Sequence, residues 1–295
     1  MAENKIYSAI MGLVVGDALG VPFEFKRRGS FTAMDMVGYG TYNQPPGTWS
    51  DDSSMTLATL ESIGRLGRID PVDIMMNFFK WYSMGEFTPY GNVFDVGGAT
   101  RKAIHRFTID PTGSKVWGGK SVMDNGNGAL MRILPVALVE HTSQDIRRVG
   151  RLTHAHEISQ TACYLYAHAV SRYELVGEMK TAIRNLGQSE TVLTIKEFNR
   201  LAKLDDLSRD EIKSTGYVVD TLEAALWCVL KTDSYRDCVL TAVNLGEDTD
   251  TVAAVAGGLA GIAYGCGGAR GIPNEWIAQI PRRDWIAELC DKLKT

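Results

Sequence analysis

Apolar positions along this chain recur mostly every three or four residues, the spacing of one face of an α-helix. This periodicity predicts helices over residues 6–19, 56–63, 71–83, 158–173, 214–230 and 235–245. The alternation of apolar and polar residues that indicates strands is sparse, and no unit repeats at a fixed period. The pattern therefore predicts a mostly helical protein.

Three stretches lack this periodicity. Residues 26–48 are rich in glycine, proline and polar side chains and are predicted to form a long surface loop. Residues 188–213 are polar and favour a loop with short helices, and a short, looser tail is expected through Pro273 and Trp285. No linker interrupts the chain, so we expect one domain over residues 1–295.

The first predicted helix carries small residues on one face. Gly12, Gly16 and Gly20 are four residues apart, so another helix can approach closely along the face that they share. Asp17 lies next to this face. We expect it to be a buried hydrogen-bond acceptor or a helix-end group in preference to a metal ligand.

A carboxyl group follows the end of this helix. Pro22 stops the helix and places Glu24 in a loop between two phenylalanines. Desolvation beside aromatic rings would raise the pKa of Glu24, which suits a gate or a proton-transfer group. A solvent-exposed Glu24 is an equally fair interpretation.

Two separated segments place carboxyl and hydroxyl groups at a predicted helix start. One is Ser50-Asp51-Asp52, and the other is Asp248-Thr249-Asp250-Thr251 before the small-residue run 252–261. Such residues often cap helices, which explains one or two of them. Carboxylates beside a close-packed helix are costly to desolvate without a cation, and clustered oxygens suit Mg²⁺, Mn²⁺ or Ca²⁺. We therefore expect a hard-cation site.

Two further segments carry weaker signals. Asp95 precedes a predicted helix through residues 103–104 and either caps it or acts in catalysis. Residues 122–132 contain a glycine-rich turn whose free N–H groups favour an anion such as phosphate. This turn lacks the lysine and Ser/Thr of a Walker loop, and no strand clearly precedes it, so neither nucleotide fingerprint fits.

Histidine and tyrosine side chains lie at two more predicted helix starts. His154 and His156 precede the helix over 158–173 and could ligate zinc. No Cys, His or Glu partner follows at a suitable spacing, so we favour capping or substrate contact. Tyr217 lies near the start of the next long helix, in the core or at the edge of a pocket.

Composition and charge exclude several classes of protein. The 295 residues are 45% hydrophobic and 22% charged, which is sufficient for a substantial core. The formal net charge of −4 argues against non-specific binding to nucleic acid. Five scattered cysteines predict reduced thiols. The N-terminus lacks a signal pattern, and the apolar run 252–263 is too short and glycine-rich for a membrane span, so we expect a cytoplasmic protein.

Taken in order, these segments resemble the ADP-ribosylglycohydrolase family, which includes the bacterial enzyme that reactivates nitrogenase reductase. The matching stretches are residues 12–24, 49–55, 126–132 and 246–251. The resemblance implies an all-α fold, a single compact domain of orthogonal helices whose central cleft holds two Mg²⁺ or Mn²⁺ ions. It also implies hydrolysis of the N- or O-glycosidic bond of ADP-ribose, with ADP-ribosyl-arginine on a protein as the leading substrate.

The resemblance also implies a role for each motif position. The implied metal ligands are Ser50, Asp51, Asp52, Asp248, Asp250 and Thr251. The implied substrate contacts are Gly126, Asn127, Gly128 and Met131 at the diphosphate, His154 at the ribose and Tyr217 on the adenine. The implied catalytic groups are Glu24, Asp95 and Asp250. Many members carry Thr where Ser50 stands, so the geometry of the metal site is less determined, and the motif does not require Glu247.

Other functions remain open for the same residues. A non-catalytic ADP-ribose-binding or structural protein on this fold would be marked by lost metal ligands, and both acidic segments are intact. A metal-dependent phosphohydrolase uses similar carboxylates, and a small ADP-ribose conjugate could replace the modified protein. The acceptor, the choice between Mg²⁺ and Mn²⁺ and the oligomeric state stay open. The family interpretation requires Asp51 and Asp250 to come together in the fold.

Overall fold

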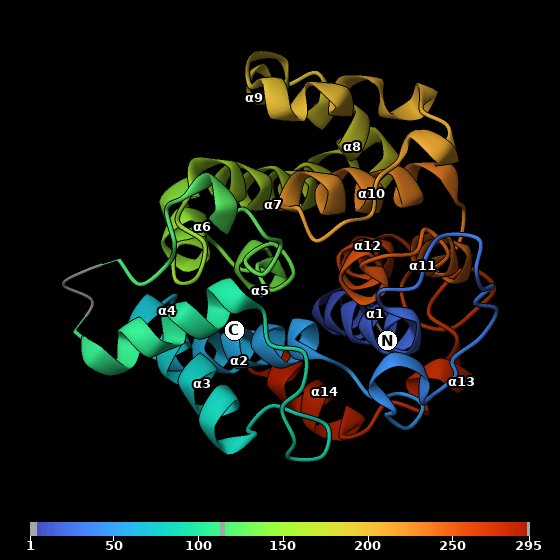
Figure 1. The fold of residues 1–295 in the computed structure, drawn as a ribbon. Coiled ribbons are helices and arrows are strands. Elements are labelled where there is room, and N and C mark those ends of the chain that lie inside the picture. The colour runs from blue at the N-terminus through green and yellow to red at the C-terminus, as the bar shows by residue number, and fades with distance from the viewer. Residues whose placement is uncertain (1–4, 113–115, 294–295) are drawn as a thin grey trace.

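Helices make up the architecture in the computed structural model, which describes residues 5–112 and 116–293 (Figure 1). The α-helices are α1 (Lys5–Gly20), α2 (Asp51–Leu66), α3 (Pro71–Met84), α4 (Gly98–Ile109), α5 (Leu134–Ala137), α6 (Ser143–Gly150), α7 (Glu157–Val176), α8 (Met179–Gly187), α9 (Glu190–Thr194), α10 (Val218–Lys231), α11 (Tyr235–Val243), α12 (Thr249–Tyr264), α13 (Asn274–Ile277) and α14 (Arg283–Asp291). Short 3-10 helices are η1 (Val21–Phe23), η2 (Gly40–Tyr42), η3 (Val122–Asp124), η4 (Lys196–Asp206) and η5 (Arg209–Glu211). Over the described ranges, backbone pairing of the β type is limited to isolated bridges. The predicted all-α fold is confirmed.

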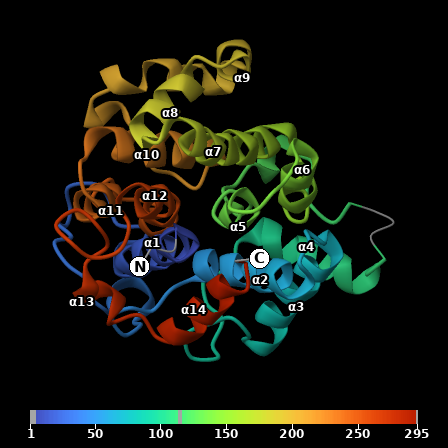
Figure 2. The ribbon, with the colours of Figure 1, turned by 180° about the vertical axis from the view of Figure 1, so that it is seen from behind.

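Helices α1 and α12 lie side by side in the middle of the molecule in both views (Figures 1 and 2). A Cβ atom added to Gly12 would lie 2.4 Å from the carbonyl oxygen of Gly257, and one added to Gly16 would lie 2.2 Å from that of Ala253. Only hydrogen fits between the two backbones at these positions. The predicted packing face on the first helix is therefore confirmed, and its partner is α12.

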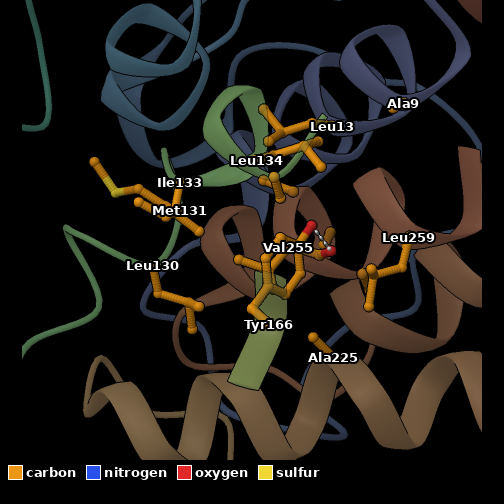
Figure 3. Close-up of a cluster of buried hydrophobic side chains, with 14 of the residues drawn as sticks. Ala9, Leu13, Leu130, Met131, Ile133, Leu134, Tyr166, Ala225, Val255 and Leu259 are labelled. Carbon is orange, nitrogen blue, oxygen red and sulfur yellow. Dashed lines mark hydrogen bonds between the residues drawn. The ribbon is translucent and has the colours of Figure 1, made fainter. Parts of the chain in front are cut away.

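Buried hydrophobic side chains of this helix pair pack with those of neighbouring helices, and Figure 3 shows one such cluster. Leu13 of α1 and Val255 of α12 are buried there together with Tyr166 of α7. The Tyr166 hydroxyl donates to the Val255 carbonyl oxygen over 3.1 Å, so this buried polar group is paired. The core thereby holds α7 against the central pair.

Segment Lys5–Phe23 is long and apolar enough, by length and composition alone, to cross a membrane. Inside the protein, 83% of its most apolar window is buried. Its apolar surface is thus already covered by the helices around it, and the central position of α1 accounts for the composition.

The helical content exceeds the prediction in three places. Helices α6 and α8 were not predicted, although Ala182, Ile183 and Leu186 of α8 have apolar helical spacing and are buried. The prediction of a loose tail is wrong, because α13 and α14 form there. Helix α14 buries Ile286 and Leu289 and packs against α1 and α2. Tertiary contact stabilises these short helices, which local sequence supports only weakly.

Candidate functional site

The contact between α1 and α12 brings the end of one helix against the start of the other. A Cβ atom on Gly20 would lie 2.3 Å from the Cα atom of Asp250. The Thr249 hydroxyl donates to the Gly20 carbonyl oxygen over 2.8 Å. Asp17 lies in the last turn of α1, so this contact places its fully buried carboxyl group near that of Asp250.

Asp17 organises the start of α2. Its carboxylate accepts hydrogen bonds from the backbone N–H groups of Ser50 (3.0 Å) and Ser53 (3.0 Å) and from the Ser53 hydroxyl (2.6 Å). These bonds satisfy N–H groups that the first turn of a helix leaves unpaired. Burial raises the pKa of Asp17 to about 6, against the lowering effect of these hydrogen bonds. The expected buried acceptor is confirmed.

The two acidic segments meet at the starts of α2 and α12. Thr251 and Asp52 are 199 positions apart, yet the Thr251 hydroxyl donates to Asp52 Oδ2 over 3.4 Å. The same oxygen accepts from the Ser50 hydroxyl over 3.0 Å. Carboxylate oxygens of Asp17, Asp52 and Asp250 lie within 4.8 Å of one another. The fold thus assembles one acidic cluster from three helices.

Asp250 also belongs to a second set of carboxyl groups. Oxygens of Glu24, Asp95 and Asp250 also lie within 4.8 Å of one another. The Tyr42 hydroxyl hydrogen-bonds with both Glu24 and Asp95. Because Asp250 belongs to both sets, the two positions are adjacent and form one extended acidic centre.

Several buried oxygens in this centre have no hydrogen-bond donor among the described residues. They are Glu24 Oε2, Asp52 Oδ1, Asp248 Oδ1 and Asp250 Oδ2. An unpaired buried carboxylate oxygen carries a large desolvation penalty, which a bound cation offsets. Oxygen donors of this kind are those that hard divalent cations take. The residues present therefore fit a divalent cation.

Burial and the proximity of like charges disfavour ionised carboxyl groups in this centre. Burial raises the pKa values of Asp51, Asp52 and Asp250 well above their ordinary range, and neighbouring carboxyl groups raise them further. Burial also raises the pKa of Glu24 to about 9, with a second contribution from the charge of Asp95. The expected desolvation of Glu24 is confirmed, and the exposed alternative is wrong, because only 5% of this residue is exposed.

Two loop residues adopt left-handed backbone conformations beside the centre. Asp95 has φ +51°, and it does not cap α4, whose N-cap is Gly97. Glu247 has φ +62°, and its side chain is exposed. Its backbone accepts from Phe25 N–H (2.7 Å) and donates to the Lys26 carbonyl oxygen (2.8 Å). Glu247 therefore ties the loop after Glu24 to the start of α12 through its backbone.

The glycine-rich turn lies against the acidic centre. Asn127 Nδ2 donates to Asp248 Oδ2 over 2.8 Å and to the Thr221 hydroxyl over 2.9 Å. The Asn127 backbone N–H donates to the Gly216 carbonyl oxygen over 3.1 Å, next to the bridge between Gly126 and Tyr217. The turn, the segment before α10 and the acidic centre are thus joined.

Two other residues predicted to contact the substrate, Tyr217 and Met131, differ in their exposure to solvent. Tyr217 precedes α10 and is 38% exposed, so its ring is available to a ligand. Met131 is buried in the core that Figure 3 shows, so its side chain packs away from solvent. His156 caps α7 by accepting from Ile158 N–H. The candidate cation groups found in the described residues consist of carboxyl groups alone.

His154 lies beneath the glycine-rich turn. It is almost fully buried, and a Cβ atom on Gly128 would lie 2.8 Å from its Cε1 atom. Burial lowers the pKa of His154 to about 3, with a further contribution from the charge of Arg132. The imidazole is therefore neutral near pH 7.

Sequence reasoning missed Tyr42 and the closeness of Asp17 to the possible ligands. Tyr42 belongs to the loop 26–48, where no periodicity marks a functional position. The only signal for Asp17 was an acidic residue next to a glycine face that packs against another helix. Its closeness to Asp250 follows from the pairing of α1 and α12, and its closeness to Asp52 follows from its hydrogen bonds to the start of α2.

Known proteins resemble this chain over nearly its whole length. A family model described as ADP-ribosylglycohydrolase matches residues 1–295. The ADP-ribosylarginine hydrolase Tri1 of Serratia proteamaculans is 32% identical over 98% of this chain and 79% of its own length. The ADP-ribosyl-dinitrogen reductase glycohydrolase of Rhodospirillum rubrum is 32% identical over 94% of this chain and 90% of its own.

A solved structure agrees with these relatives. A chain of an ADP-ribosylglycohydrolase-related protein complex superimposes with a TM-score of 0.76 and 31% identity, over 99% of this chain and 98% of that one. Fold, site and relatives together define an all-α hydrolase with a buried acidic centre. The chain belongs to the ADP-ribosylglycohydrolase family.

Proposed function

We propose that this chain hydrolyses the bond between ADP-ribose and an arginine side chain of a protein, with divalent cations in the acidic centre. The names of the two relatives at 32% identity support the arginine-linked substrate and the modified protein. The observation that carries the chemistry is the set of buried carboxylate oxygens without donors at the starts of α2 and α12.

Two cations, Mg²⁺ or Mn²⁺, are proposed because two carboxyl sets share Asp250. The residues that would hold them are Ser50, Asp51, Asp52, Asp248, Asp250 and Thr251. When bound, such ions polarise substrate oxygens and make a bound water more acidic. The central cleft around them stays a prediction.

Residues of the chain itself would manage the protons of the reaction. We assign the proton transfers to Glu24 and Asp95, whose carboxylate oxygens lie within 4.8 Å of each other and which both hydrogen-bond with Tyr42. One of the two groups is ionised and accepts a proton from the attacking water. The other is protonated and donates its proton to the leaving nitrogen. The oxygen of water then bonds to the anomeric carbon as the carbon–nitrogen bond breaks. Nearby carboxylates stabilise the positive charge that develops on the sugar.

Binding of the ADP-ribose unit is proposed for the glycine-rich turn and its neighbours. Gly126, Asn127 and Gly128 would face the diphosphate, because free backbone N–H groups favour anions. His154 would contact the ribose region, and the ring of Tyr217 would stack on the adenine. The hydrogen bond from Asn127 to Asp248 would then couple the diphosphate position to the acidic centre.

Charge-removing substitutions in both halves of the centre test this proposal. We expect Asp51→Asn and Asp250→Asn each to lower turnover of an ADP-ribosylarginine peptide by about 100-fold or more, because each replaces a charged proposed cation ligand by a neutral amide. Free ADP-ribose released with Mg²⁺ or Mn²⁺ is measured by chromatography and mass spectrometry. The matched control is Glu247→Gln, which neutralises an exposed carboxylate next to Asp248 and should retain wild-type turnover.

The products distinguish the other candidate functions. Turnover by both Asn variants at the wild-type rate would refute the proposed centre. Release of inorganic phosphate in place of ADP-ribose would identify a phosphohydrolase, and tight ADP-ribose binding without product would identify a binding protein. A parallel ADP-ribosylserine peptide tests the acceptor, and preferential cleavage of that peptide would contradict the arginine assignment.

A further inference from the structure

Arg132 is a fully buried arginine without an acidic partner among the described residues. Its two terminal nitrogens share the Val149 carbonyl oxygen at 3.3 Å, and Nη2 donates to the Thr153 hydroxyl oxygen over 2.7 Å. The guanidinium lies 4.6 Å from the ring centroid of Phe78. A buried charge normally has a compensating partner of opposite charge, so a buried guanidinium without one is unusual.

The contact to Thr153 continues to His154. Thr153 Oγ1 lies 2.8 Å from His154 Nδ1, and one proton must lie between these two atoms. Arg132 already donates to Thr153 Oγ1, so the hydroxyl proton is free to point elsewhere. No second acceptor for that proton contacts Thr153 in the part of the chain that the structure describes. The hydroxyl therefore donates to Nδ1, because otherwise its proton would be buried without a partner.

This arrangement determines the tautomer of the imidazole. A neutral histidine carries one N–H, so an imidazole that accepts a hydrogen bond at Nδ1 from a hydroxyl carries its own proton on Nε2. Nε2 lies 3.5 Å and 3.4 Å from the Cβ positions that side chains at Gly126 and Gly128 would occupy. The described residues form no hydrogen bond with Nε2. Its N–H group is thus left for a ligand on the glycine-rich turn.

We propose that Arg132 and Thr153 are positioning residues that hold His154 as the Nε2–H tautomer, so that it donates a hydrogen bond to an oxygen of the ligand bound at the glycine-rich turn. The ligand oxygen belongs to the diphosphate or to the adjoining ribose, since both accept from a neutral N–H group. This assignment rests on the proposed ADP-ribose function. The buried charge of Arg132 adds a favourable field for an anion, and it adds to the effect of burial that keeps the imidazole neutral.

Glycine at position 128 supports the same arrangement. An added Cβ atom would lie 2.8 Å from His154 Cε1 and 3.3 Å from Thr100 Oγ1. A side chain here would displace the imidazole and fill the space in front of Nε2. The turn thus lets ligand and imidazole approach each other, in addition to offering its own N–H groups.

Nitrogen NMR of the imidazoles tests the tautomer without a ligand. The protein has five histidines, and His154→Gln identifies the His154 signals. We expect wild-type protein at pH 7 to show a protonated Nε2 and an unprotonated Nδ1 for His154. Thr153→Val preserves the side-chain shape but removes the donor, so Nδ1 and Nε2 should share the proton between two tautomers. Thr153→Ser should restore the wild-type signals.

Calorimetry with ADP-ribose in Mg²⁺ tests the consequence for binding. We expect Thr153→Val to weaken binding by at least about twofold, because the Nε2–H tautomer that binds the ligand is then only about half populated. In turnover, KM should rise while kcat changes less, because the contact is made in both ground and transition states. Thr153→Ser should bind as wild type does. Thr232→Val is the control, since it removes another buried hydroxyl, at the end of α10.

Each outcome has a separate meaning. A proton on Nδ1 of His154 in the wild-type protein would overturn the tautomer assignment, whatever the activity. A Thr153→Val variant with the wild-type tautomer and affinity would overturn the positioning role. Failure of the wild-type protein to bind ADP-ribose, with the Nε2–H tautomer present, would instead refute the proposed function.

Discussion

His154 is neutral in the folded protein because burial lowers its pKa from 6.5 to about 3. In the unfolded chain the same imidazole takes up a proton near pH 6.5, whereas the folded protein does not until about pH 3. The unfolded state therefore binds more protons between these values. His154 then lowers the free energy of unfolding progressively as the pH falls from 6.5, and it has no such effect above that pH.

Substitution of this residue should remove that dependence. We expect the difference in unfolding free energy between wild type and His154→Gln to be constant from pH 8 to 7. Below pH 6.5 the wild type should lose about 1.4 kcal/mol per pH unit more than the variant. Urea unfolding at pH 8, 7, 6 and 5 measures both proteins, and the other titrating groups are common to them. Parallel curves at pH 6 and 5 would show that His154 is protonated in the fold.

Most of the residue types at the site could be predicted from the sequence. Carboxyl and hydroxyl groups at two helix starts indicated a cation site, because their desolvation is unfavourable without one. The tautomer of His154 was not readable. It depends on a hydrogen bond to Thr153, whose orientation is set by Arg132 from another segment.

At the scale of elements, the contact between α1 and α12 positions the acidic centre. We expect Gly16→Ala to destabilise the protein by about 1–3 kcal/mol, because the new methyl group would lie 2.2 Å from the Ala253 carbonyl oxygen. Affinity for Mg²⁺ should fall as well, since separation of the two helices moves Asp17 and Asp250 apart. Urea unfolding and calorimetric Mg²⁺ titration measure the two effects.

Gly98→Ala provides the matched control for this substitution. Gly98 is also helical, at the start of α4, and an added Cβ atom meets no neighbour within 4 Å. Alanine favours helix over glycine, so no loss of stability is expected. A Gly16→Ala protein as stable as Gly98→Ala would show that the two helix backbones can separate without cost.

Helix existence was more predictable than helix extent. The 3.6-residue period identified α1, α3, α7 and α10, whose buried faces are long. It placed the apolar face of α2 from residue 56, and the polar residues before that face located the start of the helix, where Ser50 and Asp17 cap the first turn. Helix α14 depends on burial of Leu289 against the rest of the protein, so its local pattern was too short to identify it.

At the scale of the whole molecule, cation binding should couple distant segments. We expect Mg²⁺ to slow amide hydrogen exchange in peptides covering both residues 50–56 and residues 248–255, since a shared ion stabilises only the state in which they meet. The effect should be about tenfold at ten times the dissociation constant. Exchange is followed by mass spectrometry with and without Mg²⁺.

Helix α9, which lies away from α1, α2 and α12 in Figures 1 and 2, serves as the internal control and should be unaffected. Asp250→Asn should abolish the protection of both peptides together, because Asp250 belongs to both carboxyl sets. Protection of only one of the two segments would be inconsistent with a site shared between α2 and α12.

The sequence by itself determined the helical class, the glycine face of α1 and the two acidic segments, because helical periodicity and desolvation cost act on residues close in the chain. Only the tertiary structure decided that Asp52 and Thr251, 199 positions apart, share a hydrogen bond, and that Asp17 and Tyr42 join the same centre. Such distances follow from how α1, α2 and α12 pack, and side-chain packing across the whole core determines that arrangement.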